Sequence, residues 1–372
     1  MNPYIYLRAL KHAEHTVFCV EKGQKTYFDT QFNRWLAYSS GQQVKRSIIE
    51  ALTSYLGKPM APVTFNYEII TKNGKQELKQ KEIWSPCNPI FVDQLIGGWM
   101  KAKDKDGTAK DEDSDEEQKS VFKRRSPLSV SAMRALHPLL AGVDYEKMTF
   151  DRSNNPENNP VKVRLGNKIL SEEEIEDFLD QNNRTLTRRN WIANKNDSRG
   201  FARTGGLFIY DVAIDLRTLF AVSTNQHEPE VSKEKIEELK AKDWIESENV
   251  FGKCLVLPKE EREKIIPTLA HALLNWRITS NQARTFSLME TLAIAISDNA
   301  NKLAGAIRAK LLEDGEKYKA KPIIDETAGA DVFVTLPCSS YVVTVNESVD
   351  AVEKAELKLI EMMNAFYKEN YI

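Results

Sequence analysis

One stretch of the chain concentrates the side chains that bind phosphate. Between Gln181 and Gly206, six cationic residues are opposed by a single acidic one, Asp197. The cations are Arg184, Arg188, Arg189, Lys195, Arg199 and Arg203, and Trp191 and Phe201 are interleaved with them. Guanidinium groups bind phosphates bidentately, and aromatic rings stack on or wedge between unpaired bases. This composition favours binding of a single nucleic-acid strand, and the competing interpretation is a solvated basic loop.

A second, smaller polar cluster begins at Gly41. Gln42 and Gln43 supply amide side chains, and Lys45 and Arg46 supply two positive charges, in the first turns of an expected helix. Unpaired backbone N–H groups at a helix start attract anions, so this cluster suits an RNA phosphate. Many helices begin with solvated polar residues, so this cluster alone is weak evidence for RNA binding. The two clusters together are stronger evidence than either one.

The residues that could hold a metal or act as acids and bases are poorly placed for it. His12 and His15 would point to opposite faces of a strand, and no third ligand is near them in the sequence. Asp211 and Asp215 share a strand face but are separated by about 13 Å, too far for a carboxylate pair. The phosphate-loop, dinucleotide, zinc-protease and serine-hydrolase motifs do not occur. We therefore expect no catalytic residue, no metal and no cofactor.

Composition and charge limit the class of protein. The chain has 372 residues, 41% of them hydrophobic, with 52 Lys and Arg against 54 Asp and Glu. Because the charges nearly cancel, any nucleic-acid surface must be local. The four cysteines, Cys19, Cys87, Cys254 and Cys338, are scattered as in reduced cytosolic thiols. No secretion signal and no apolar run of about 18 to 20 residues is present, which predicts a cytoplasmic protein that does not bind membranes.

Hydrophobic spacing indicates the elements that would position these residues. It predicts helices over 41–56, 129–140, 171–179, 260–276, 301–312 and 348–367. It predicts strands over 5–20 and 207–216, a hairpin turn at Asn73-Gly74, and a hairpin or two short strands over 332–345. Residues 21–40 read as a loop, and 288–297 is ambiguous between helix and strand. The order favours an α+β fold of the βαββαβ type, an antiparallel sheet with helices on one face and a long insertion after the first helix.

An acidic tract interrupts that insertion. Residues 101–117 contain eight carboxylates and no large apolar side chain, so nothing there offsets the entropy of ordering. The tract predicts a disordered loop over 101–120, which either points away from bound RNA or contacts a positively charged partner.

Four stretches resemble a known family. They are SGQQVKRSI at 40–48, TGGLFIYDVAIDL at 204–216, SPLSVSA at 126–132 and NWRITSNQAR at 275–284. In their order along the chain they resemble the backbone subunits of type I CRISPR effector complexes (Cascade), in the DevR-like branch of the RAMP superfamily. The resemblance covers nearly the whole chain.

The resemblance implies a hand-shaped molecule. The palm would be an RRM-like core of residues 1–60 and 207–372, the fingers the insertion 61–180, and the thumb an Arg-rich hairpin over 181–206. Lys45 and Arg46 match the helix start that contacts the guide backbone, and the arginines of 181–206 match the thumb that grips it. The resemblance also favours a strand for 288–297.

The resemblance further implies partners for antiviral defence. Copies of such a subunit stack head to tail along the crRNA, and each thumb displaces a base so that the intervening bases pair with the target DNA strand. Other Cascade subunits complete the assembly. Such contacts are sequence-independent, since specificity belongs to base pairing.

Two other functions stay open. Related type III backbone subunits cleave target RNA with an aspartate between the first strand and helix, where this chain has Asp29. The other alternative is a stand-alone RRM-like RNA-binding protein, although Asp211 and Asp215 stand where base-stacking aromatics would be expected.

Overall fold

The structure, a computed structural model, describes residues 2–18, 24–72, 74–101, 121–146, 162–185, 201–278, 286–312, 318–343 and 346–370. Its strands are β1 (Tyr4–Thr16), β2 (Thr26–Asp29), β3 (Arg34–Ser39), β4 (Thr64–Lys72), β5 (Lys75–Trp84), β6 (Trp99–Lys101), β7 (Phe122–Arg124), β8 (Leu128–Val130), β9 (Met133–Ala135), β10 (Ala141–Glu146), β11 (Arg164–Leu165), β12 (Lys168–Ile169), β13 (Phe201–Asp215), β14 (Ala221–Ser223), β15 (Ile245–Asn249), β16 (Gly252–Val256), β17 (Thr291–Ser297), β18 (Ile307–Leu312), β19 (Lys319–Ile324) and β20 (Asp331–Val334). Its α-helices are α1 (Gly41–Leu56), α2 (Val92–Gly97), α3 (Glu172–Gln181), α4 (Leu216–Leu219), α5 (Lys233–Lys240), α6 (Lys259–Asn275), α7 (Ala300–Ala306) and α8 (Ala351–Asn370).

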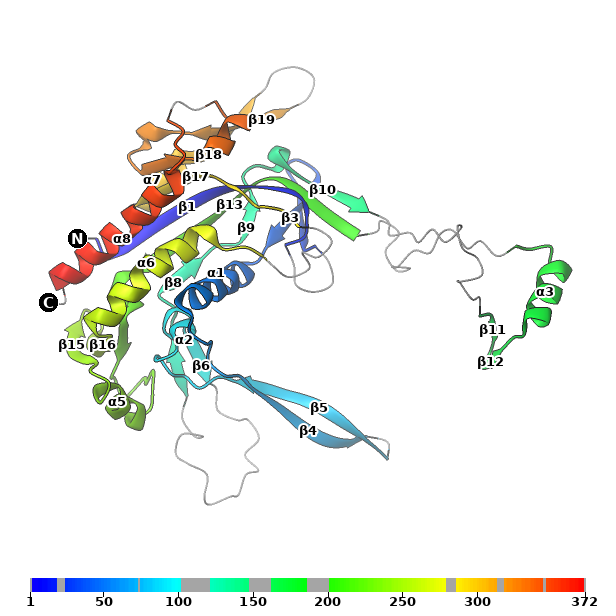
Figure 1. The fold of residues 1–372 in the computed structure, drawn as a ribbon, viewed down its shortest axis with the longest axis horizontal. Coiled ribbons are helices and arrows are strands. Elements are labelled where there is room, and N and C mark those ends of the chain that lie inside the picture. The colour runs from blue at the N-terminus through cyan, green and yellow to red at the C-terminus, as the bar shows by residue number, and fades with distance from the viewer. Residues whose placement is uncertain are drawn as a thin grey trace.

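A large antiparallel sheet forms the body of the fold. Its strand order is β2-β3-β9-β13-β1-β17-β20, with β8 and β10 also paired with β13 (Figure 1). The long strands β1 and β13 lie side by side, and Leu7 pairs with Val212 while Arg8 pairs with Asp211. Because side chains alternate along a strand, the Leu7 face is buried and the Arg8 face carries charge. The predicted mixture of helices and antiparallel sheets is confirmed.

Helices α1, α6 and α8 cover the Leu7 face of the sheet (Figure 1). Helix α1 begins after Ser40, whose hydroxyl accepts a hydrogen bond from the Gln43 N–H, and ends at Gly57 in the left-handed conformation. Val44, Ile48 and Leu52 recur at helical spacing and point into the core. The sequence prediction for this helix is confirmed at both ends.

The opposite face of the sheet is covered differently from the prediction. We expected helices on one face only, but Leu303 of α7 packs on this second face, near Leu10 and Ile209. Strands β18 and β20 join the same cluster. The reason is that part of this face is also apolar, so it too must be buried.

Four further predictions need correction. Residues 129–140 form β8, β9 and a 3-10 helix (Pro138–Leu140) rather than an α-helix, and residues 21–40 contain the β2-β3 hairpin rather than only a loop. Residues 301–312 divide into α7 and β18, and the described residues of 332–345 contain one strand, β20, followed by a 3-10 helix (Leu336–Ser340). In the first case Val130, Met133, Leu136 and Leu140 are spaced as in a helix, but β13 offers an edge that β8 and β9 fill. Pairing with a neighbouring strand therefore outweighs the local pattern.

Other predictions are confirmed. Strands β4 and β5 pair as the predicted hairpin, with Lys72 opposite Lys75, and extend together from the body (Figure 1). Helix α3 forms where a helix was predicted and begins with a capping box between Ser171 and Glu174, and α6 forms where the helix over 260–276 was predicted. The ambiguous 288–297 contains β17. The predicted disordered loop, apart from Lys101, lies outside the described residues. Within them no helix is long and apolar enough to cross a membrane.

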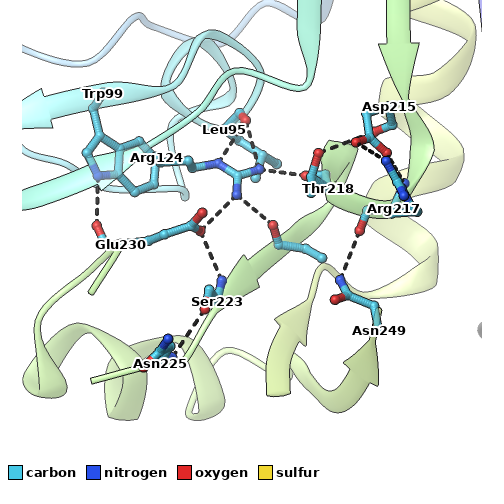
Figure 2. Close-up of polar contacts among 11 residues, drawn as sticks. Leu95, Trp99, Arg124, Asp215, Arg217, Thr218, Ser223, Asn225, Glu230 and Asn249 are labelled. Carbon is cyan, nitrogen blue, oxygen red and sulfur yellow. Dashed lines mark hydrogen bonds and ion pairs between the residues drawn. The ribbon is translucent and has the colours of Figure 1, made fainter. Parts of the chain in front are cut away.

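A buried arginine joins the insertion to the chain that follows β13. Figure 2 shows Arg124 of β7, which is 3% exposed, reaching across this junction. Its guanidinium donates to the carbonyls of Thr218 and Ala221 at 2.7 Å and of Leu95 at 3.3 Å, and pairs with the Glu230 carboxylate at 2.9 Å. Burial lowers the pKa of Arg124, and Glu230 opposes that shift. The network therefore fixes α2 and β7 against α4 and β14.

Candidate nucleic-acid interface

The start of α1 is held against the sheet by a close backbone approach. A Cβ atom at Gly41 would lie 2.5 Å from the Val130 carbonyl oxygen, so only glycine fits there. Gln42 is exposed, while Gln43 is half-buried and its amide donates to the Ser47 hydroxyl at 3.5 Å. The first turn contains no acidic residue that would neutralise the positive end of the helix. The helix start therefore presents an amide and backbone N–H groups at a fixed place beside β8.

The two cations predicted at this helix have different settings. Lys45 is half-buried and donates to the Gly97 carbonyl at 3.1 Å, at the end of α2, and burial lowers its pKa to about 8. Arg46 keeps 70% of its side chain exposed and pairs with Glu50 at 2.7 Å. Arg46 is therefore accessible to a ligand, whereas Lys45 positions α2 against α1.

The burial of Lys45 predicts a pH dependence of stability. Between its folded pKa of about 8 and its ordinary value of 10.5, Lys45 has lost its proton in the folded chain but keeps it in the unfolded chain. The unfolded state then binds more protons, so the free energy of unfolding contributed by this group rises with pH. Urea unfolding at pH 8 and pH 10 should show that the free energy of unfolding rises less with pH in Lys45→Gln than in the wild type. The exposed Lys72→Gln is the control, and equal rises in all three proteins would contradict the prediction.

Most of the predicted thumb lies outside the described residues. Arg188, Arg189, Trp191, Lys195 and Arg199 all fall between residues 186 and 200. The residues at its two ends are described: Arg184 is exposed beyond α3, and Phe201 and Arg203 belong to β13.

The end of the predicted thumb segment belongs to the central sheet. Strand β13 begins at Phe201, so residues 201–206 pair with β10 rather than forming the end of a separate hairpin. Arg203 stands opposite Asp144 and is only 8% exposed. The strand was predicted over 207–216, but it begins earlier and passes through Gly205 and Gly206.

A cleft on the Arg8 face of the sheet was missed in the sequence. It has a volume of about 380 Å³ and is lined by Tyr6, Arg8, Ser131 and Asp211, among others. Arg8 Nε lies 2.6 Å from Asp211 Oδ1, and Arg134 Nη2 lies 3.9 Å from the same carboxylate. Two guanidinium groups thus share one carboxylate, and of the two only Arg8 lines the cleft. The alternation along β1 could have indicated this face in the sequence, since Tyr6 and Arg8 separate buried residues.

The remaining candidate residues have structural partners. His12 Nδ1 lies 2.9 Å from Glu290 Oε1 and 2.7 Å from the Tyr341 hydroxyl. Asp29 ends β2 and accepts a hydrogen bond from the Phe32 N–H at 2.8 Å. Asp211 and Asp215 pair with different arginines, Arg8 and Arg217. In the described part of the chain no three His, Cys, Asp or Glu side chains group as metal ligands.

Comparisons with known proteins give distant likenesses. No family model matches the sequence, and a search of curated proteins gives no significant match. One similar solved chain is described as a CRISPR RNA-guided surveillance complex, with 9% identity and a TM-score of 0.38 over 98% of this chain and 85% of that one. Another is described as a CRISPR RNA-guided surveillance complex, pre-nicking, with 9% identity and a TM-score of 0.42 over 98% of this chain and 89% of that one. At this distance the likeness assigns neither fold nor function.

Proposed function

We propose that this protein is the repeating backbone subunit of a CRISPR surveillance complex, in which it binds guide RNA without cutting it. The observation that carries the proposal is the start of α1, where Gln42 and Arg46 are exposed and the first turn of the helix contains no acidic residue. This is the segment whose sequence resembles the guide-contacting helix of type I backbone subunits. An amide, a guanidinium and backbone N–H groups bind phosphate without reading bases.

The order of the central strands supports an RRM-like palm. Along the chain the elements are β1, α1, β9, β13, α6 and β17, and in the sheet the strands lie in the order β9-β13-β1-β17, all antiparallel. A split βαβ fold has this chain order of strands and helices. Under the proposal residues 1–60 and 207–372 form the palm, 61–180 the fingers, and 181–206 the thumb with its base in β13.

The proposal includes the assembly that the resemblance implies. Copies of the subunit stack head to tail along crRNA in the cytoplasm, next to other Cascade subunits, and hold the guide open for target DNA. The contacts are to the RNA backbone, so any guide sequence is accepted. A wedge such as Trp191 would displace one base per subunit.

The thumb arginines provide the test of the proposed grip. In the double variant Arg188→Ala and Arg189→Ala, the slope of log affinity against log salt should become less negative by about 1.4. Each phosphate contact to a single strand contributes about 0.7 to the size of that slope. The measurement is binding of a labelled single-stranded RNA at several salt concentrations. Lys233→Ala with Lys253→Ala removes two exposed cations on α5 and β16 and serves as the control. If both double variants bind with the wild-type affinity and slope, the thumb does not grip RNA.

A further inference from the structure

A groove on the Arg8 face, beside Gly205 and Gly206 of β13, is lined by cations from distant parts of the chain. Its volume is about 720 Å³, and it is open to solvent. Arg34 comes from β3, and Lys319 and Lys321 come from β19. Gly205 and Gly142 line it with backbone and no side chain. Among the described residues that line the groove, none is acidic.

The β18-β19 hairpin places like charges directly opposite each other. Lys310 of β18 pairs with Lys321 of β19, and Lys319 lies two residues away on the same face. Lysines in directly opposite positions repel and destabilise a strand pair. All three are exposed, and none forms an ion pair with a described residue, whereas the neighbouring Arg308 pairs with Asp325 at 3.2 Å. The hairpin thus keeps a concentration of positive charge that its own described side chains do not neutralise.

The geometry of these cations matches an extended polyanion. Lys319 and Lys321 are separated by about 7 Å along one strand face, close to the separation of successive phosphates in an extended strand. Arg34 faces the groove from β3 and is fixed by a hydrogen bond to the Pro138 carbonyl at 3.1 Å. A small anion would need only one of these groups, whereas a strand would use all of them.

We propose that this groove binds the phosphodiester backbone of single-stranded RNA, as a contact separate from the start of α1. The two sites are joined by β3, which begins at Arg34 and ends at Ser39, the residue before the N-cap of α1. Five residue steps along a strand span about 17 Å, so one RNA strand can follow β3 from the groove to the helix. The assignment rests on the proposed function in one respect, that the ligand is RNA.

Neutralisation of the lysines by phosphate has a second consequence. Bound RNA removes the repulsion between Lys310 and Lys321, so it should stabilise the hairpin as well as occupy the groove. Loss of Lys321 should therefore leave the melting temperature of the free protein unchanged or raise it, while reducing the rise on adding RNA. A merely structural lysine would lower the melting temperature of the free protein instead.

The test compares Lys319→Ala with Lys321→Ala, made together, against the control Lys233→Ala with Lys253→Ala. The probes are labelled 20-nucleotide oligo(U) and oligo(A), titrated at several salt concentrations. For both probes the slope of log affinity against log salt should be less negative by about 1.4 in the groove variant than in the wild type. The melting temperature of the free groove variant should be at least equal to that of the wild type. If the wild type binds and the groove variant matches it in affinity and slope, the groove inference is overturned and the proposed function stands. If the wild type binds neither probe, both are overturned.

Discussion

Replacing Arg124 with alanine is expected to lower the free energy of unfolding by about 3–5 kcal/mol, as for removal of one partner from a buried ion pair. The change would leave Glu230 without its cation and the carbonyls of Leu95, Thr218 and Ala221 without their buried donor. Because these groups come from both sides of the junction in Figure 2, the insertion would lose its main polar attachment to the chain after β13. Urea unfolding monitored by circular dichroism measures the change.

The adjacent Arg125 provides a matched control. It has the same side chain but is exposed, so Arg125→Ala should change the free energy of unfolding by no more than about 0.5 kcal/mol. Equal stability of the two variants would show that the Arg124 network does not hold the junction together.

A second large effect is expected at the floor of the groove. Gly206 has a φ of 124°, and a Cβ atom there would lie 2.3 Å from the Leu140 carbonyl oxygen. Gly206→Ala combines backbone strain with a clash against the backbone at Leu140. We expect it to lower the free energy of unfolding by about 3 kcal/mol. Gly142→Ala is the control, because it faces the same groove and its Cβ atom would meet nothing within 4 Å. Thermal unfolding of the two variants separates them, and an equal shift in both would contradict the steric argument.

The elements that could be predicted from sequence are those whose pattern and end signals agree. Helix α1 has Ser40, an apolar stripe and Gly57, and each signal specifies the same boundaries. Strand β13 has the buried Phe208 and Tyr210 on one face, and the other face has Asp211 beside the buried Ile209. In such segments local preference and tertiary environment point to the same structure.

The elements that could not be predicted depend on partners far away in sequence. The strands of 129–140 exist because β13 has an edge to fill, and the β2-β3 hairpin is joined to the sheet by β9, where Arg134 pairs with Tyr38. Strand β13 extends over residues 201–206 because these residues pair with β10. None of these contacts leaves a periodic signal within its own segment.

The residues of the candidate interface also divide into those that could and those that could not be predicted from the sequence. Gln42 and Arg46 were predicted from adjacent residues, and both are exposed. Lys45 has the same charge as Arg46, but the position of α2 directs it to the Gly97 carbonyl. Arg34 and Lys319 are far apart in sequence and only the folded chain brings them to one groove. A cluster of cations assembled by the fold leaves no motif.

The contacts proposed here would act on one strand of RNA. The helix start and the groove would hold phosphates at two places along β3, and the thumb would reach over the strand from a neighbouring copy. Because these groups are cations, amides and backbone donors, affinity should depend on salt and length far more than on base sequence.

The most direct test of the central claim is the binding of purified wild-type protein to intact single-stranded RNAs of increasing length, with Mg²⁺ present. Complex mass by size-exclusion chromatography with light scattering is read together with RNA integrity on a denaturing gel. A backbone subunit predicts that the number of copies per RNA increases with RNA length while the RNA stays intact. One copy per RNA at every length would contradict the claim in favour of a stand-alone binder, and RNA cleavage that Asp29→Ala abolishes would contradict it in favour of a nuclease.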